Sequence, residues 1–228
     1  MKLPLSDRLL ACAAFVRPGD RVADIGCDHG YLSIYLLKND IASSVIAADI
    51  NEQPLQSAIH NAVKFDVRDQ MTFYLSDGVR NVPRDFDCMV CAGMGGDTMI
   101  SILEAAPWLR TGSYRLILQC QSKTPMLRHY LSTNGWRIAR ETVLRDGRFL
   151  YTVMEVCRDA DAPGLSVGEC HFSPALLQSK SPELKAYYRW VVEGLRIATR
   201  HKDDPEKLQA LTELTENEAY AWLMEEES

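Results

Sequence analysis

The sequence predicts an α/β protein: a mostly parallel sheet with helices on both faces, followed by a C-terminal helical hairpin. Strand-like and helix-like stretches alternate through the first two-thirds of the 228 residues, which is typical of βαβ units. The last two strand-like runs are joined by RDGR, residues 145–148, and the Asp-Gly pair indicates a tight antiparallel turn. Beyond residue 157 the strand pattern stops and two helical stretches follow.

The elements can be placed in order from their apolar patterns. A first helix begins after Ser6, a candidate N-cap residue, and ends at RPGD, residues 17–20. Apolar side chains at helical spacing, such as Leu55, Ala58 and Ile59, mark the crossover helices. The predicted strands are 21–25, 45–50, 71–75, 87–92, 115–119, 137–143 and 150–156. Such a sheet is Rossmann-like, and its terminal antiparallel hairpin is typical of class I methyltransferases more than of dehydrogenases.

The C-terminal helices are predicted at 182–202 and 205–226, as an antiparallel hairpin with a coiled-coil-like character. We therefore expect two domains, residues 1–157 and 158–228. On a helical wheel at about 100° per residue, four cations of the predicted helix 182–202 fall within about 60° of one another. We name this set the basic stripe: Lys185, Arg189, Arg196 and Arg200. Two interpretations stay open, a solvated face or a surface that contacts phosphates.

Composition excludes several classes of protein. With 46% hydrophobic and 25% charged residues, the chain is neither disordered nor fibrous. Because the net charge is −6, binding to nucleic acid requires a local basic patch. The seven cysteines lack the spacing of a disulfide framework or a zinc site, and Cys88 and Cys91 should point to opposite faces of one strand. We expect a cytoplasmic protein without metal or membrane contact, whose oligomeric state stays open with a monomer favoured.

Three acidic residues stand at the carboxyl ends of the first three predicted strands. Asp24 precedes a turn glycine by two residues, Asp49 closes the second strand, and Asp77 follows the third. In this architecture, carboxylates at strand ends accept hydrogen bonds from ribose hydroxyls or from an adenine amino group. Each acid alone is also typical of a helix cap or a turn. Together they favour an adenosyl cofactor that lies across the strand ends.

The loop after the first strand decides between two adenosyl cofactors. A dinucleotide needs a glycine-rich G-x-G-x-x-G path free of nearby anions, because it brings a pyrophosphate. Here the loop runs from Gly26 to Tyr31, and the middle glycine is replaced by Asp28. An anion at this position repels pyrophosphate but is compatible with the sulfonium and ammonium groups of S-adenosylmethionine. The sequence therefore predicts S-adenosylmethionine as the cofactor.

A second glycine-rich loop follows the fourth strand. Many methyltransferases that act on nitrogen carry Asn/Asp-Pro-Pro-aromatic here, whereas this chain has Gly93-Met94-Gly95-Gly96. Such a backbone can approach a planar base closely, although a tight turn would also explain the glycines. Gln119, at the predicted end of the fifth strand, offers an amide to a base edge, or is a buried glutamine satisfied by backbone.

Five stretches of the chain resemble the bacterial tRNA adenine-N1 methyltransferases that modify position 22. The stretches are RLLACAAFVRPGDRVADIGCDHGYL, DGV, CAGMGG, LILQ and LRHYLSTNGWRI. The resemblance covers residues 5 to about 156 closely and implies a target-base region at Gly93 to Gly96 and a helical hairpin that helps to hold tRNA. This chain departs from the family at Cys27, Gly30 and Ser33, and at Gln119-Cys120, where the family often has Gln-Pro.

The candidate site residues form three sets. The catalytic set is Asp28, Tyr31, Gly93, Met94, Gly95 and Gly96. The cofactor set is Asp24, Gly26, Cys27, Asp28, Gly30, Asp49, Ile50, Asp77, Gly78, Ala92 and Gly93. The tRNA set is Arg8, Gln119 and the basic stripe.

The expected reaction is in-line transfer of a methyl group to N1 of an adenine in tRNA. N1 of neutral adenine has a free lone pair, so the enzyme mainly positions donor and acceptor and extracts the base. Asp28 either accepts a hydrogen bond from the adenine amino group or caps the following helix. Two other functions stay open: a small-molecule methyltransferase whose hairpin dimerises, and a non-catalytic tRNA-binding protein.

Overall fold

The computed structural model describes residues 3–200 and 204–225 and shows one seven-stranded sheet in the order β3-β2-β1-β4-β5-β7-β6. β7 runs antiparallel to both of its neighbours, and the other pairs are parallel. The strands are β1 (Asp20–Ile25), β2 (Ala42–Asp49), β3 (Met71–Leu75), β4 (Cys88–Gly95), β5 (Arg115–Ser122), β6 (Trp136–Asp146) and β7 (Phe149–Arg158). The predicted sheet and its terminal hairpin are therefore confirmed.

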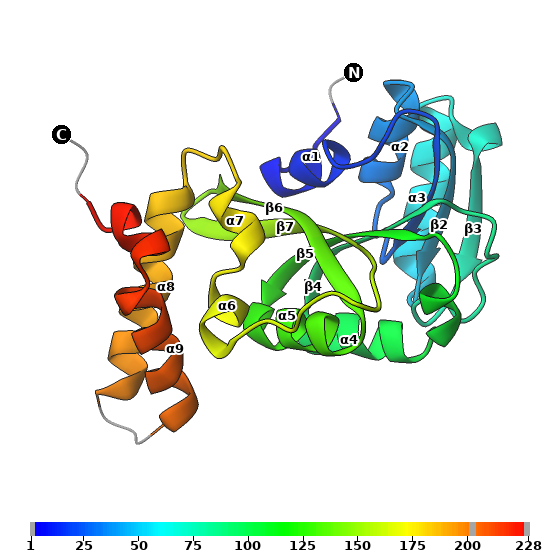
Figure 1. Ribbon diagram of the computed structural model, residues 1–228. Helices are drawn as coiled ribbons and strands as arrows, with labels where there is room; N and C mark the ends of the chain where they lie inside the picture. The colour runs from blue at the N-terminus through cyan, green and yellow to red at the C-terminus, as the bar shows by residue number, and fades with distance from the viewer. Residues whose placement is uncertain (1–2, 201–203, 226–228) are drawn as a thin grey trace.

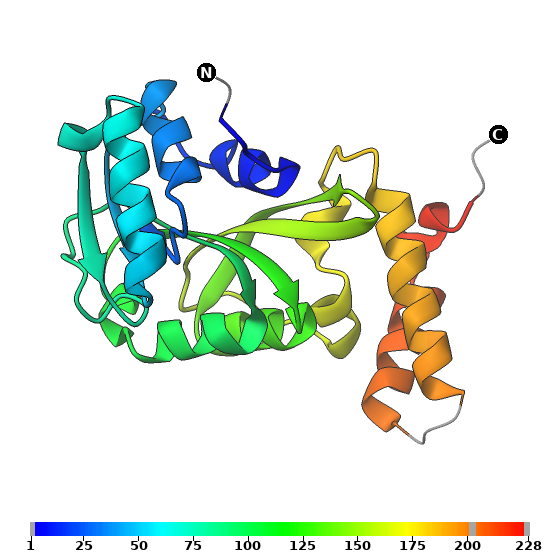
Figure 2. The same ribbon diagram turned by 180° about the vertical axis from the view of Figure 1, so that it is seen from behind.

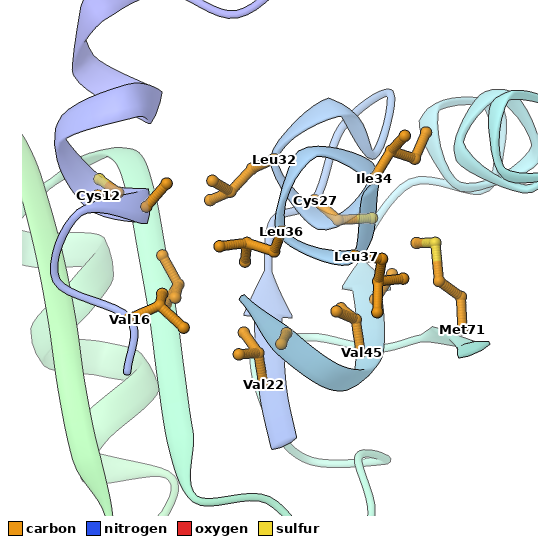
Figure 3. Close-up of a cluster of buried hydrophobic side chains, with 14 of the residues drawn as sticks. Cys12, Val16, Val22, Cys27, Leu32, Ile34, Leu36, Leu37, Val45 and Met71 are labelled. Atoms are coloured by element: carbon orange, nitrogen blue, oxygen red, sulfur yellow. The ribbon is translucent and has the colours of Figure 1, made fainter. Parts of the chain in front are cut away.

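Helices cover both faces of this sheet (Figures 1 and 2). One face carries α1 (Asp7–Ala13), α2 (Tyr31–Lys38) and α3 (Glu52–Lys64), and the other carries α4 (Gly96–Glu104) and α5 (Thr124–Thr133). Figure 3 shows the first core, in which Cys12 of α1 and Leu36 of α2 pack toward Val22 and Val45 of the sheet. Short 3-10 helices, η1 (Arg68–Gln70) and η2 (Pro107–Arg110), complete the connections.

The burial of Cys88 and Cys91 confirms the predicted alternation of side chains along β4. Cys88 is 0% exposed and belongs to the core beneath α1 to α3, whereas Cys91 is 1% exposed and belongs to the core beneath α4 and α5. The pair thus points to opposite faces of β4, as the strand alternation predicts. Among the described residues, no group of three or more His, Cys, Asp or Glu is arranged to hold a metal ion. No helix in these same ranges is long and apolar enough to cross a membrane.

The C-terminal segment forms a third core around Phe172, Tyr188 and Leu214. It contains α6 (Val167–His171), α7 (Pro174–Leu177), α8 (Leu184–Thr199), α9 (Pro205–Glu216) and η3 (Glu218–Leu223). In Figures 1 and 2, α8 and α9 run antiparallel and stand apart from the β3 edge of the sheet. The predicted helical hairpin is therefore formed by α8 and α9. Residues 201, 202 and 226, which the prediction included, lie outside the described residues.

Two details of this segment differ from the sequence prediction. The second helix does not continue to residue 226, because Asn217 adopts an extended backbone and its side chain accepts a hydrogen bond from the Ala219 N–H, which starts η3. The short helices α6 and α7 were not predicted. Their signals were present, since Ser166 and Glu169 form a capping box and Ser173 caps a helix that opens with proline.

Candidate active site

The main cavity, of about 570 Å³, opens at the carboxyl ends of β1, β2 and β4. Strand order reverses between β1 and β4, and ligands of α/β sheets bind at such a switch point. The predicted site residues that line the cavity are Arg8, Asp24, Gly26, Cys27, Asp28, Tyr31, Asp49, Ile50, Asp77, Gly78, Ala92, Gly93, Met94 and Gln119. Gly30, Gly95, Gly96 and the basic stripe do not line it. The structure thus brings together most residues that the sequence singled out.

The loop around Asp28 orients the carboxylate of Asp49. The Asp28 N–H donates to Asp49 Oδ2 at 3.1 Å, and the Asn51 N–H donates to Asp49 Oδ1 at 2.9 Å. Each oxygen keeps a lone pair for a further donor. The side chain of Asp28 is 69% exposed at the cavity, and within the described chain it does not cap α2, whose N-cap residue is Gly30. Of the two roles that the sequence left open for Asp28, capping is therefore not observed.

Asp24 is a buried carboxyl at the floor of the cavity. Its side chain is 3% exposed and accepts a hydrogen bond from the Ser33 hydroxyl at 2.6 Å. Burial raises the pKa of Asp24 from its ordinary 3.8 to about 6, the Ser33 hydrogen bond lowers it, and the nearby Asp49 charge raises it. A cation in the cavity would favour the ionised form. Burial likewise raises the pKa of the Cys27 thiol, which stays protonated.

Asp77 and Gly78 line the cavity together with residues of α4. Asp77 is exposed and pairs with Arg80, with Oδ2 and Nε 3.2 Å apart. An exposed ion pair of this kind contributes little, so the carboxylate can exchange its partner for a ligand. Ile102 of α4 packs directly over Gly78, and Ile50 is 62% exposed at the rim. The site therefore offers apolar contact and an acceptor together.

The glycine loop is held by a glutamine from the neighbouring strand. Gly93 has φ +79° and is an unpaired bulge residue in β4, and its N–H donates to Gln119 Oε1 at 3.0 Å. Gln119 is 0% exposed, which favours the backbone-satisfying role over the predicted tRNA contact. β5 continues three residues past the predicted end, so the exposed glutamine at the cavity is Gln121. The two-residue alternation from Gln119 was the signal that could have found it.

Gly96 sits against the β5–α5 connection, which leads to a testable difference between two adjacent glycines. A Cβ on Gly96 would lie 2.6 Å from the Lys123 carbonyl oxygen, which is backbone, whereas a Cβ on Gly95 would meet only the side chains of Asp97 and Ser122. We expect Gly96→Ala to lower the free energy of unfolding by about 1–3 kcal/mol. Urea denaturation measures this, with Gly95→Ala as the matched control that changes it less. Equal losses in the two variants would contradict the packing argument.

The N-terminal helix and its N-cap residue contribute two polar side chains to the cavity. Arg8 Nε lies 2.7 Å from Asp146 Oδ2, and its guanidinium stacks on the Tyr151 ring. Ser6 occupies the predicted N-cap position of α1, but its hydroxyl makes no capping bond. That hydroxyl is buried and has no hydrogen-bond partner in the described part of the chain. An orphaned hydroxyl and a guanidinium that line the same cavity fit an anionic group of a bound ligand.

The basic stripe faces away from this site. Lys185 and Arg189 donate to the backbone carbonyl of Glu225, and the two remaining arginines lie 3.8 Å from the carboxylate of Glu193. On the helical wheel the stripe lies about 180° from the side of α8 that faces β5 and β7. The sequence could not reveal this, because helical periodicity does not say which neighbour each face meets. The tRNA contact of the stripe stays a prediction, without support from its position.

Comparison with known proteins assigns the family. The methyltransferase domain family matches residues 5–154. The tRNA (adenine(22)-N(1))-methyltransferase of Bacillus subtilis is 33% identical over 170 residues, which cover 73% of this chain and 71% of that protein. The chain belongs to this family of tRNA methyltransferases. A relative in Mycoplasma genitalium is 35% identical, and the matched part covers 59% of this chain and 61% of that protein, less than two-thirds.

A solved structure extends the likeness over both parts of the methyltransferase. TrmK of M. capricolum in complex with S-adenosyl-homocysteine, its natural cofactor product, superposes with a TM-score of 0.72 at 25% identity. The match covers 91% of this chain and 92% of that one. It therefore includes helical residues beyond the sheet, and the predicted class I methyltransferase fold is confirmed.

Proposed function

We propose that this methyltransferase transfers a methyl group from S-adenosylmethionine to N1 of adenine 22 in tRNA. The observation that carries the proposal is the 33% identity to the Bacillus subtilis enzyme of that name. The cavity supports it, because carboxylates from three strand ends, the Arg8 guanidinium and the Ser6 hydroxyl line one space of about 570 Å³. That set suits a ligand with a ribose, a cationic centre and a carboxylate.

The residues present fit this cofactor, which supplies a methyl group activated on a sulfonium. Asp49 has the lone pairs to accept both ribose hydroxyls, and Asp77 with Gly78 receives the adenine. Asp24 faces the cationic part, where its negative charge is favoured. We assign Arg8 and Ser6 to the cofactor carboxylate, in place of the tRNA contact predicted for Arg8, because both line this cavity.

For the target base, the chain provides position more than proton transfer. The lone pair of adenine N1 attacks the methyl group directly, so no general base is needed. The base is held in line by Gly93 and Met94 of the glycine loop and by the ring of Tyr31, which all line the cavity. Asp28 accepts a hydrogen bond from the adenine amino group. The positive charge that develops on the methylated ring is then close to a carboxylate.

The test is methylation of an unmodified tRNA transcript with radiolabelled S-adenosylmethionine, followed by mapping of the reverse-transcription stop. We expect one stop at position 22, and none on a transcript in which adenine 22 is replaced by guanine. A stop at another position would overturn the assignment of the base. Binding of tRNA without any methyl transfer would favour the non-catalytic alternative.

Asp28→Asn is expected to lose far more turnover than cofactor affinity. The amide keeps the size of the side chain but loses the negative charge beside the methylated ring. Turnover is measured at saturating substrates, and cofactor affinity by calorimetry. Asp40→Asn is the matched control, because Asp40 is exposed and has φ +54° beside +50° for Asp28. Equal losses of turnover and cofactor affinity in Asp28→Asn would reduce Asp28 to a binding or structural residue.

A further inference from the structure

A second cavity, of about 260 Å³, lies between the end of β5, strand β7 and helix α8. Its walls include Gln121 from β5, Pro125 from α5, Thr152 from β7, and Tyr187 and Trp190 from α8. It is thus built from both the sheet and the C-terminal helices. None of these five residues belongs to the predicted site, and the cofactor needs none of them.

The second cavity adjoins the first at Gln121. This residue lines both cavities, and its amide nitrogen lies 3.5 Å from the position that a Cβ would take on Gly93. Gly93 belongs to the loop assigned to the target base. A nucleic-acid strand that delivers its adenine to Gly93 therefore places a neighbouring nucleotide beside Gln121, at the mouth of the second cavity.

The walls of the second cavity have the chemistry that recognises an unpaired base. Trp190 is 63% exposed, which is unusual for a tryptophan, and its ring centroid lies 5.7 Å from that of Tyr187. Exposed aromatic rings are the stacking platforms on which proteins hold single-stranded bases. Thr152, which also lines the second cavity, is 2% exposed, and its hydroxyl has no hydrogen-bond partner among the residues that the structure describes. A base edge would satisfy this hydroxyl.

Polar groups at the rim fit a phosphodiester backbone. Lys123 and Lys207 line the cavity and pair with Asp97 and Asp204 at 2.7 and 2.6 Å. The Lys123–Asp97 pair is exposed, so exchanging its carboxylate for a phosphate costs little, whereas the Lys207–Asp204 pair is half-buried. Burial, followed by the Arg128 charge, lowers the pKa of His171, whose neutral imidazole adds one donor and one acceptor.

We propose that the second cavity binds the base of a nucleotide next to the target adenine, stacked on Trp190. The inference rests on the proposed function and deepens it, because it assigns the recognition of substrate context to the junction between sheet and C-terminal helices. It also gives α8 a role in which the side opposite the basic stripe contacts the tRNA.

The test compares Trp190→Ala with Trp222→Ala on unmodified tRNA transcripts. Trp222 is 43% exposed on η3, stacks under Lys185 and does not line the cavity, so it is the matched control. We expect Trp190→Ala to raise the KM for tRNA roughly tenfold, as the loss of one base–aromatic stack does, with kcat and cofactor affinity nearly unchanged. Trp222→Ala should leave the KM within about twofold of the wild type.

Transcripts with an abasic site on either side of adenine 22 identify the occupant. For the wild-type protein, one of the two abasic transcripts should bind more weakly than the intact transcript. For Trp190→Ala, that abasic transcript and the intact transcript should bind equally well. The proposal is overturned if Trp190→Ala and Trp222→Ala raise the KM for tRNA equally. It is also overturned if the abasic site still weakens binding to Trp190→Ala. Failure of the wild-type protein to methylate tRNA would instead refute the proposed function, so the two failures are distinguishable.

Discussion

Arg128→Ala is expected to lower the free energy of unfolding by roughly 3–5 kcal/mol, because it leaves a buried charge without its partner. Arg128 and Glu141 are both 0% exposed, and Arg128 Nη2 lies 2.7 Å from Glu141 Oε1. Arg128 Nη1 also donates to the carbonyls of Cys170 and His171 at 2.9 and 2.8 Å. Burial is the largest influence on the Arg128 pKa and lowers it, but Glu141 and Tyr187 together outweigh burial and raise this pKa. The variant removes all of these bonds together.

Urea denaturation with two comparison variants checks this expectation. Arg21→Ala breaks an exposed ion pair with Asp87 and should change the unfolding free energy very little. Arg128→Met combined with Glu141→Met removes both charges and should recover most of the stability that Arg128→Ala loses. If Arg128→Ala lowers the free energy of unfolding as little as Arg21→Ala does, the Arg128–Glu141 pair does not stabilise the fold as argued.

The same pair connects the catalytic sheet to the C-terminal helices. Arg128 comes from α5 and Glu141 from β6, while the two carbonyls belong to the end of α6. Ser173, which caps α7, donates its hydroxyl to Glu141 as well. The aperiodic segment after residue 157 is thus anchored to the sheet, and α8 follows from it. We therefore expect Arg128→Ala to weaken tRNA binding more than cofactor binding.

The sheet and the cofactor side of the site were predictable because local rules determine them. Parallel strands end at one edge, so the acids at the ends of β1 and β2 and just after β3 had to meet, and they line one cavity. Strand boundaries were less certain from local pattern. Because β5 extends to Ser122, the sequence selected the buried Gln119 and missed Gln121.

The proposed tRNA contacts were not predictable in the same way, because they depend on how separate elements pack. The basic stripe was visible in the sequence, but its direction depends on the packing of α8 against α9 and β7. Trp190 lies on the same helix and drew no attention, since one tryptophan in an amphipathic helix is usually part of the core. Only the packed structure shows it exposed beside a cavity that adjoins the glycine loop through Gln121.

Asp24→Asn is expected to stabilise the protein without cofactor at pH 8, by up to about 3 kcal/mol, while it weakens cofactor binding. Burial is the main reason that the pKa of Asp24 rises from 3.8 to about 6, so the folded state favours the neutral carboxyl. The free energy of unfolding therefore falls as pH rises from about 4 to 6, and the full cost of the buried charge applies above that range. Asparagine stays neutral at every pH and can still accept the Ser33 hydrogen bond.

Denaturation at pH 4 to 8 measures the difference in the free energy of unfolding between the wild type and Asp24→Asn. The contributions of groups that titrate in both proteins cancel in this difference. The difference should be small at pH 4 and grow toward pH 6. Ser33→Ala removes a hydrogen bond that lowers the Asp24 pKa, so it should shift the same transition to higher pH. A destabilised Asp24→Asn at pH 8 would contradict the assignment of a buried, unfavourable charge.

The cofactor reverses the sign of this effect. A sulfonium or ammonium near Asp24 favours the ionised carboxyl, so cofactor binding releases a proton when the free protein holds one. Calorimetry should show wild-type affinity that weakens as the pH falls below about 6, and a weaker affinity of Asp24→Asn that changes little over that range. A more stable Asp24→Asn with weaker cofactor binding would show that the charge buried at the end of β1 serves ligand binding.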